Sequence, residues 1–208
     1  MPLPDLIARL DPPPADVVQS AKNLNYRAFI LVGLIVNRAE LFPDNWIYVH
    51  SPGFKVGRIQ NFKNWSAAMV LDPSKTSLGM EYFCDEGDEI WTMSEADLIG
   101  LAAHEIARLG LADPEDVEDG VVIRQTRAYP TYTTDYGEHL NTIRRFLTTI
   151  DNLQTIGRNG MHRYDNQDHA MLTGMLAARN LLGEDHDLWS VNTERFYYEG
   201  STTEALRG

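Results

Sequence analysis

Short apolar runs, broken by proline, glycine and asparagine, dominate the first half of the chain. The longest, residues 26–37 (YRAFILVGLIVN), is rich in β-branched and aromatic residues and predicts a buried strand. Shorter runs predict strands at residues 46–50, 56–62 and 77–84, and a fifth strand is expected within residues 117–128. Strands that follow one another this closely are typical of antiparallel pairing.

The clearest helical periodicity lies at residues 95–109. Ser94 is a favourable N-cap for this helix, Asp97 follows at the spacing of a capping box, and Gly110 provides a C-terminal stop. One apolar stripe runs along the predicted helix and favours packing on the sheet. The stripe consists of Leu98, Leu101, Ala102, Ile106 and Leu109.

Three further helices are predicted, at residues 15–24, 136–150 and 169–182. The last is expected to be capped by Asp168, after a short strand at residues 153–156 and a polar loop at 157–166. The expected fold is therefore α+β: a mostly antiparallel sheet with flanking helices, then a C-terminal strand-loop-helix. The patterns GxGxxG and GxxxxGK are both absent, so this chain carries no dinucleotide or phosphate-loop fingerprint.

Composition narrows the classes of partner. The 208 residues are 43% hydrophobic, which suits a folded core, and their formal net charge of -12 disfavours nucleic acids and anionic membranes. Cys84 is the single cysteine, and no Cys/His spacing resembles a zinc site, so we expect no metal and a reducing cytoplasm. No signal peptide is visible, and the longest apolar run, residues 29–36, is far shorter than a membrane span.

Residues 157–174 (GRNGMHRYDNQDHAMLTG) concentrate the chemistry of the chain. A polar loop with two arginines and a tyrosine leads directly into a predicted helix. The first-turn amides of a helix have no internal partners and carry partial positive charge, so they suit a ligand that carries or develops negative charge. Glycines at 157 and 160 permit a close approach of the backbone.

This segment resembles the C-terminal flavin-binding motif of UDP-galactopyranose mutases and their amine-oxidase-like relatives. The resemblance lies in a Gly-Arg pair at 157–158, an Arg-Tyr pair at 163–164, a polar pair and a following helix. Residues 42–49 and 57–66 also resemble substrate-domain strands of bacterial FAD-dependent oxidoreductases. The chain is thus similar to the C-terminal part of an FAD-dependent oxidoreductase of the amine oxidase, protoporphyrinogen oxidase and UDP-galactopyranose mutase-like superfamily.

The resemblance implies different roles for different parts of the chain. It assigns residues 1–150 to a substrate-binding type of sheet and helices, 151–185 to a region that contacts FAD, and 186–208 to a tail that includes Phe196, Tyr197 and Tyr198. The N-terminal Rossmann unit of the family is absent. Asn166-Gln167 replaces an acidic-Met pair common in the family, which favours a general flavin oxidoreductase over a mutase.

The resemblance also implies which residues form the site, although it assigns no catalytic residue. Backbone amides near the start of the last helix would face the pyrimidine end of the flavin. The implied cofactor-binding residues are Gly157, Arg158, Tyr164, Asn166, Gln167, Asp168, His169 and Met171. The expected substrate-binding residues are Arg58, Asn61 and Lys63, which alternate along one predicted strand, and Tyr129 of a Tyr-Pro segment.

Three interpretations remain open from the sequence. In the first, the chain is part of an FAD-dependent enzyme that acts on a small molecule, and it is inactive without the missing FAD-binding half. In the second, it is a cofactor-free module that binds a sugar nucleotide or a protein partner. In the third, a separate polypeptide supplies the missing half. An exposed apolar surface would favour self-association or a complementary chain in each case.

Overall fold

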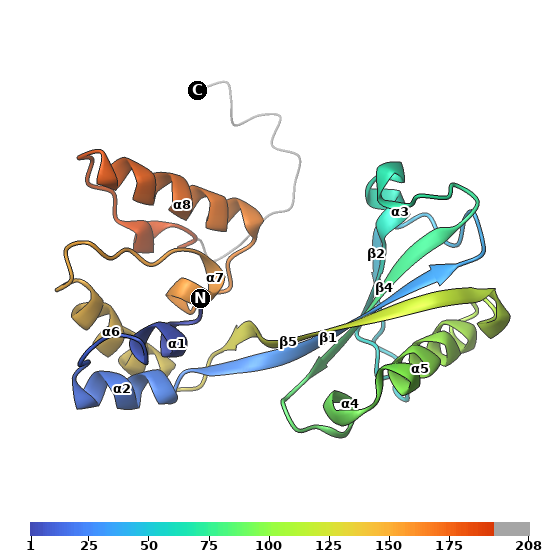
Figure 1. Cartoon of the computed structure of the whole chain (residues 1–208), viewed down its shortest axis with the longest axis horizontal. Helices are drawn as coiled ribbons and strands as arrows, with labels where there is room; N and C mark the ends of the chain where they lie inside the picture. The colour runs from blue at the N-terminus through green and yellow to red at the C-terminus, as the bar shows by residue number, and fades with distance from the viewer. Residues whose placement is uncertain (194–208) are drawn as a thin grey trace. The chain divides into compact units, whose positions relative to one another are not determined.

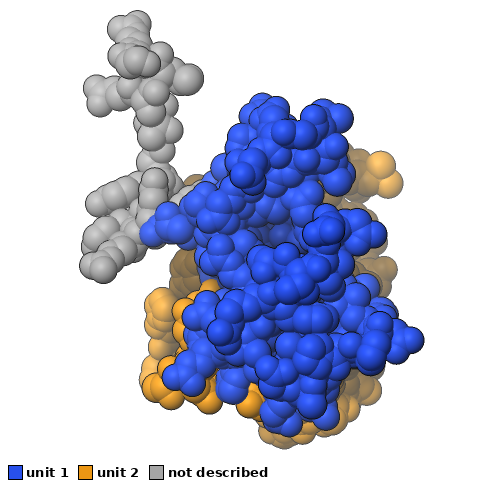
Figure 2. All heavy atoms as spheres, turned by 90° about the vertical axis from the view of Figure 1, so that its left-hand side faces the viewer, with its two compact units in different colours: residues 1–22, 137–208 blue, residues 23–136 orange. Residues whose placement is uncertain are grey.

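The structure is a computed structural model that describes residues 1–193. The chain forms two compact units, drawn in different colours in Figure 2. The sheet unit comprises Asn23–Tyr136, and the helical unit comprises Met1–Lys22 with the chain from Gly137 onward. The N-terminal helices therefore group with the C-terminal ones, a division that differs from the ranges expected from the sequence. The aromatic residues 196–198 of the expected tail lie outside the described residues.

The sheet unit contains one five-stranded sheet with the order β2-β3-β4-β1-β5. All of its pairings are antiparallel, as the close spacing of the strands predicts. The strands are β1 (Asn25–Val36), β2 (Trp46–Tyr48), β3 (Arg58–Asn61), β4 (Thr76–Cys84) and β5 (Val117–Thr131). The edge strand β5 accommodates Pro130, because an edge position needs no second row of hydrogen bonds.

One face of the sheet is packed by helix α5 (Glu95–Arg108), as Figure 1 shows. Alternate residues of β1 point to this face and are fully buried, because strand side chains alternate with a period of two. The α5 stripe meets them as predicted, and the Ser94 hydroxyl accepts the Asp97 amide at 3.1 Å. The buried core contains Ile30, Val32, Leu34, Met80, Tyr82, Leu98, Ala102 and Ile106.

The opposite face of the sheet, here called the open face, carries the remaining alternate residues of the strands. Their register places Phe29 beside Phe83, Leu31 beside Glu81, and Glu81 beside Arg58. Several apolar side chains of this face are exposed, including Tyr48 at 56%, Val121 at 58% and Ile123 at 52%. Short elements of the same unit are α3 (Phe62–Trp65), η1 (Ala67–Met69), α4 (Glu89–Thr92) and η2 (Pro114–Asp116).

The helical unit consists of short helices around a small core. Its elements are α1 (Leu3–Ile7), α2 (Ala15–Lys22), α6 (Tyr136–Leu147), α7 (Gly157–Met161), α8 (Gln167–Leu181) and η3 (Leu188–Ser190). Leu3, Ile7, Ile143 and Met161 are among its most deeply buried side chains. Helix α1 contacts α2 and α7, so the N-terminal helices support the segment that carries the predicted flavin motif.

Three predictions for this segment are wrong. Residues 153–156 are not a strand: Ile156 has extended backbone angles, but the segment packs on α8, where Gln154 donates to the Ala177 carbonyl at 3.2 Å. Part of the predicted loop is helix α7. Helix α8 begins at Gln167, with Asn166 as its N-cap instead of Asp168. The expected strand-loop-helix is therefore a helix-loop-helix.

Candidate functional site

Gly157 begins the predicted cofactor segment with a backbone φ of +68°, a conformation that favours glycine. Its N–H donates to the Thr173 hydroxyl at 3.2 Å, and that hydroxyl donates to the Ala170 carbonyl at 2.9 Å. Thr173 is fully buried and thus fastens the start of α7 to the middle of α8. Sequence reasoning overlooked Thr173, because a single threonine inside a helix carries no distinctive pattern.

Arg158 and Tyr164 form a cationic and aromatic surface patch. The guanidinium carbon of Arg158 lies 4.6 Å from the centroid of the Tyr164 ring, within cation–π range. Nε of Arg158 donates to the Asp165 carbonyl at 2.8 Å, which holds the side chain across the loop. Tyr164 is 49% exposed, so one surface of this pair faces outward. The structure thus brings together two residues that the motif predicted as neighbours of the cofactor.

The start of α8 brings together the other predicted cofactor residues. The Asn166 amide donates to Nδ1 of His169 at 3.2 Å, so His169 caps the helix from its third position. An Asp168 oxygen lies 3.5 Å from the same nitrogen, which already accepts a hydrogen bond. Gln167 and Asp168 are exposed, and Met171 is 64% exposed. His169 thus has a structural role, and its contact with a cofactor stays a prediction.

Asp165 is a second residue that the sequence did not single out. It is 3% exposed, and one carboxylate oxygen accepts the Asn192 side-chain amide at 2.8 Å, while its other oxygen has no hydrogen-bond partner. Arg163 donates to the carbonyls of Trp189 and Val191. Residues 189–192 are therefore hydrogen-bonded to the motif, and backbone carbonyls hold the Arg163 side chain in place.

In the sheet unit, Arg58 lies on the open face in an ion pair with Glu81. Nε and Nη2 of Arg58 approach one Glu81 oxygen at 2.7 and 2.6 Å, and Gln60 donates to the other oxygen at 2.5 Å. Burial opposes the charged form of Arg58, but its hydrogen bonds to Glu81 and Tyr48 outweigh this effect and raise its pKa. Arg58 is therefore a fixed positive charge.

Asn61 and Lys63 do not share the face of Arg58, and the expected alternation along one strand is wrong. Strand β3 ends at Asn61, which is 2% exposed and points to the other side of the sheet. Lys63 lies in α3, where its ammonium donates to the carbonyls of Ala39, Pro73 and Lys75 at 2.6–3.0 Å. These three bonds use all three ammonium donors. Substrate contacts of Asn61 and Lys63 stay predictions without geometric support.

Tyr129 does lie on the open face, at the end near Phe29 and Phe83. Its ring centroid is 6.2 Å from that of Phe29 and 5.6 Å from that of Phe83. The ring is half-buried by these neighbours. The open face thus joins an aromatic cluster to the Arg58–Glu81 pair, and of the four predicted substrate residues it contains Arg58 and Tyr129.

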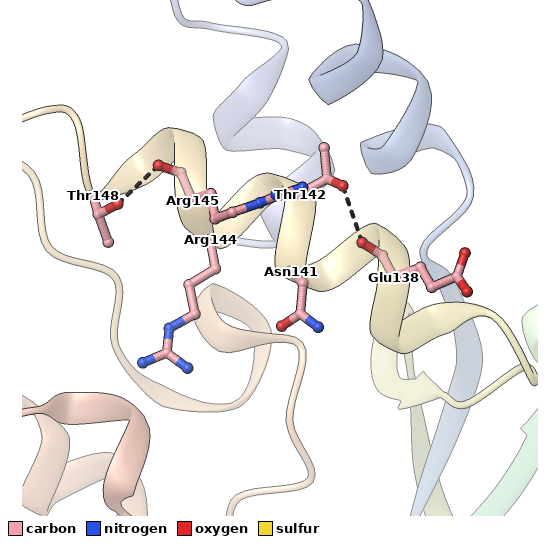
Figure 3. Close-up of a pocket in the computed structure, with 6 residues that line it drawn as sticks. All are labelled: Glu138, Asn141, Thr142, Arg144, Arg145 and Thr148. Carbon is pink, nitrogen blue, oxygen red and sulfur yellow. Dashed lines mark hydrogen bonds between the residues drawn. The ribbon is translucent and has the colours of Figure 1, made fainter.

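Two hollows in the helical unit contain none of the predicted residues. The first, of about 700 Å³, is lined by side chains of α6 and the residue after it, as Figure 3 shows. Its two threonine hydroxyls donate to carbonyls of the same helix, at 3.1 Å for Thr142 and 2.8 Å for Thr148. The second, of about 410 Å³, lies between α6, α8 and η3. With one helix as its wall, the first hollow has no converging ligand groups.

Within residues 1–193, no group of three or more His, Cys, Asp or Glu side chains is arranged to hold a metal ion. Among the helices described, none combines the length and apolar character that crossing a membrane requires.

Comparison with known proteins gives matches in structure. No protein-family model matches the chain, and no curated protein matches its sequence. Among solved structures, reduced UDP-galactopyranose mutase matches 93% of this chain with a TM-score of 0.78 and 21% sequence identity, over 43% of the mutase chain. This likeness confirms the predicted α+β fold.

Two further structures match less closely. A protein provisionally assigned as a protoporphyrinogen oxidase from Exiguobacterium sp. 255-15 matches 72% of this chain and 32% of its own, with a TM-score of 0.57 and 13% identity. Putrescine oxidase bound to putrescine matches 88% of this chain and 42% of its own, with a TM-score of 0.54 and 16% identity. The chain therefore has the fold of part of UDP-galactopyranose mutase, and it spans less than half the length of each of these structures.

Proposed function

We propose that this chain is the flavin- and substrate-facing portion of an FAD-dependent enzyme, either an amine oxidase-like oxidoreductase or a mutase-like enzyme. The observation that carries the proposal is the match of 93% of the chain to only 43% of UDP-galactopyranose mutase. The flavin-motif resemblance of residues 157–174 supports the same assignment. The part that would bind the ADP of the cofactor lies outside this sequence.

The residues of the helical unit fit one end of a flavin. Helix α8 has 15 residues and begins beside the Arg158–Tyr164 patch, so its first-turn amides and the guanidinium place positive charge there, beside the exposed carboxylate of Asp168. When bound, FAD would supply hydride or electron transfer. Arg158 and the amides near Gln167 would favour negative charge on the flavin, and Tyr164 would offer a flat ring beside it.

Residues 1–193 contain no strand-turn-helix unit of the kind that binds ADP in dinucleotide-binding folds. Such sites lie at the carboxyl ends of parallel strands, beside a glycine-rich turn, whereas every strand pairing described is antiparallel and GxGxxG is absent. Helix α8 also exposes Met171, Leu172 and Met175, at 64%, 44% and 58%. An exposed apolar helix face of this kind suits a second protein part. We therefore expect the isolated chain to be inactive.

The open face supports the substrate role of the sheet unit. It combines a fixed guanidinium, at Arg58, with aromatic rings that include Tyr129. Such a surface suits a small molecule with a polar and an apolar part. The net reaction, oxidation or isomerisation, depends on the complete enzyme.

A flavin titration with two matched variants tests the proposal. Flavin fluorescence is followed as wild-type chain, Arg158→Ala or Arg179→Ala is added, with circular dichroism to confirm folding. Arg179 is an exposed arginine of the same helical unit and serves as the control. We expect Arg158→Ala to weaken flavin binding by roughly tenfold, the effect of losing about 1.4 kcal/mol, and Arg179→Ala to bind like wild type. Equal binding by all three proteins would remove Arg158 from the flavin site.

A further inference from the structure

Glu81 is a buried carboxylate near the middle of the open face. It lies on β4 between Leu31 of β1 and Arg58 of β3, and it is 1% exposed. One of its oxygens accepts a hydrogen bond from Nε of Arg58 and lies 2.6 Å from Nη2, and the other accepts a hydrogen bond from the Gln60 side-chain amide. The carboxylate thus holds two side chains of the neighbouring strand in fixed orientations.

Packing alone does not account for this polar group. Replacing a buried ion pair by apolar side chains of similar size is often neutral or stabilising, so a buried pair is weak evidence for a stabilising role. The neighbours Leu31, Phe29 and Phe83 show that the open face accepts apolar residues at adjoining positions. The Arg58–Glu81 pair therefore needs a further explanation.

The geometry leaves part of the Arg58 guanidinium for a ligand. Its side chain is 22% exposed, compared with 1% for the side chain of Glu81. A guanidinium has five N–H donors. Nε and one N–H of Nη2 are directed to Glu81, and Nη1 lies 3.5 Å from the Tyr48 hydroxyl. The remaining N–H groups of Nη1 and Nη2 form an outer edge suited to two oxygens of a single anion.

We propose that Glu81 is a positioning residue which fixes Arg58, and that Arg58 binds a negatively charged group, phosphate or carboxylate, of the substrate. This inference rests on the proposed function, because it assigns the open face to the substrate. A planar guanidinium held rigidly in place matches the planar carboxylate and the oxygens of phosphate better than a mobile ammonium would.

Aromatic rings border this anion site on both sides. The guanidinium carbon of Arg58 lies 5.8 Å from the Tyr48 ring centroid, and Trp46 stacks on Trp65 at 5.2 Å with an interplanar angle of 18°. In the opposite direction along the face lies the cluster of Phe29, Phe83 and Tyr129. The substrate class is therefore an anion joined to a flat or apolar portion that rests on these rings.

The test measures anion binding to the folded chain by NMR. Inorganic phosphate and acetate are titrated separately into ¹⁵N-labelled protein. The Nε–H signal of Arg58 reports binding where Arg58 is present, and the backbone amide signals of β3 and β4 report it in every variant. The phosphate and acetate arms distinguish the two sources of negative charge. The proteins are wild type, Glu81→Gln, the double variant Arg58→Met with Glu81→Leu, and Arg38→Met. Arg38 is the matched control, since it pairs with Asp113 and Asp116 in the same unit.

We expect wild type and Arg38→Met to bind at least one anion with the same affinity. Glu81→Gln should weaken binding roughly tenfold and shift the Arg58 Nε–H signal even without the anion, because the guanidinium loses its fixed partner. The double variant should fold and bind neither anion at this face. It keeps the test decisive if Glu81→Gln proves poorly folded, because it removes both charges together.

Two results would overturn the inference: a folded double variant that binds anions as wild type does, or a wild-type Arg58 signal that responds to neither anion. A flavin titration of the same proteins separates this inference from the proposed function. Unchanged flavin binding with no anion binding defeats only the role of Glu81 and Arg58. Anion binding without any flavin binding defeats the proposed function and leaves an anion site on the open face.

Discussion

Glu105 joins helix α5 to the loop between β2 and β3, and its replacement should loosen the sheet unit. The side chain is 1% exposed and accepts the backbone amides of Lys55 and Val56 at 2.6 and 3.1 Å. The Tyr82 hydroxyl donates to the same carboxylate at 3.1 Å. A carboxylate accepts at both oxygens, so it satisfies three donors from two elements of the sheet unit.

The perturbation Glu105→Gln keeps the size of the side chain and replaces one oxygen by an NH₂ group. The new NH₂ group must face at least one of the three donors, so at least one hydrogen bond is lost. The remaining hydrogen bonds become weaker, because their acceptor no longer carries a negative charge. We estimate a cost of about 2–4 kcal/mol in the free energy of unfolding. Tyr82→Phe removes only one donor and should cost about 1–2 kcal/mol.

Urea unfolding followed by tryptophan fluorescence measures these differences, and hydrogen exchange of the Lys55 and Val56 amides locates them. Glu86→Gln, at an exposed position of the same unit, is the matched control and should stay within about 0.5 kcal/mol of wild type. The reasoning would be refuted if Glu105→Gln matched this control and the two amides stayed protected.

Three further predictions follow from burial and exposure. Burial, and then the charge of Glu105, raise the pKa of Tyr82, so the folded state binds the hydroxyl proton more tightly than the unfolded state. The stability that this proton contributes is complete below pH of about 10 and is lost as the pH rises above it. In urea titrations above that pH, wild type should lose stability relative to Tyr82→Phe by up to about 1.4 kcal/mol per pH unit. Burial also raises the pKa of the Cys84 thiol, and the residue is 1% exposed. A thiol reagent should therefore modify Cys84 only as fast as the sheet unit opens, and fast modification of folded protein at neutral pH would contradict this prediction. Replacing the exposed Met171 and Met175 by Gln should change the free energy of unfolding by less than about 0.5 kcal/mol and should reduce self-association in sedimentation experiments. Unchanged self-association would show that α8 is not the contact surface.

Much of the sheet unit could be predicted because local signals there agree with the tertiary contacts. Strand β1 is a long β-branched run, and α5 has both an apolar stripe and the Ser94 cap. The extension of β5 through Pro130 was less evident, because only the sheet order shows that β5 is an edge strand. Residues 153–156 show the converse limit: an extended segment becomes a strand only if another strand lies beside it.

The sequence predicts the candidate site only where a local motif marks it, and not where tertiary contacts decide. Motif resemblance located the Arg158–Tyr164 patch, but the choice of Asn166 over Asp168 as N-cap depends on where His169 reaches. No local sequence pattern marks Glu81, because only the register of β3 and β4 joins it to Arg58 across 23 positions of sequence. Lys63 lies outside the predicted strand because the chain turns into α3 directly after β3.

The most direct test of the central claim is a titration of the isolated wild-type chain with FMN and with FAD, followed by visible absorbance. The account predicts saturable and weak binding of both, with dissociation constants within about tenfold of each other, because both share the isoalloxazine ring and the proposed function assigns the ADP portion of FAD to a part outside this chain. Absence of binding of either flavin to folded protein would contradict the claim that this chain faces the flavin. Tight binding of FAD alone would contradict the claim that the ADP-binding part lies outside it.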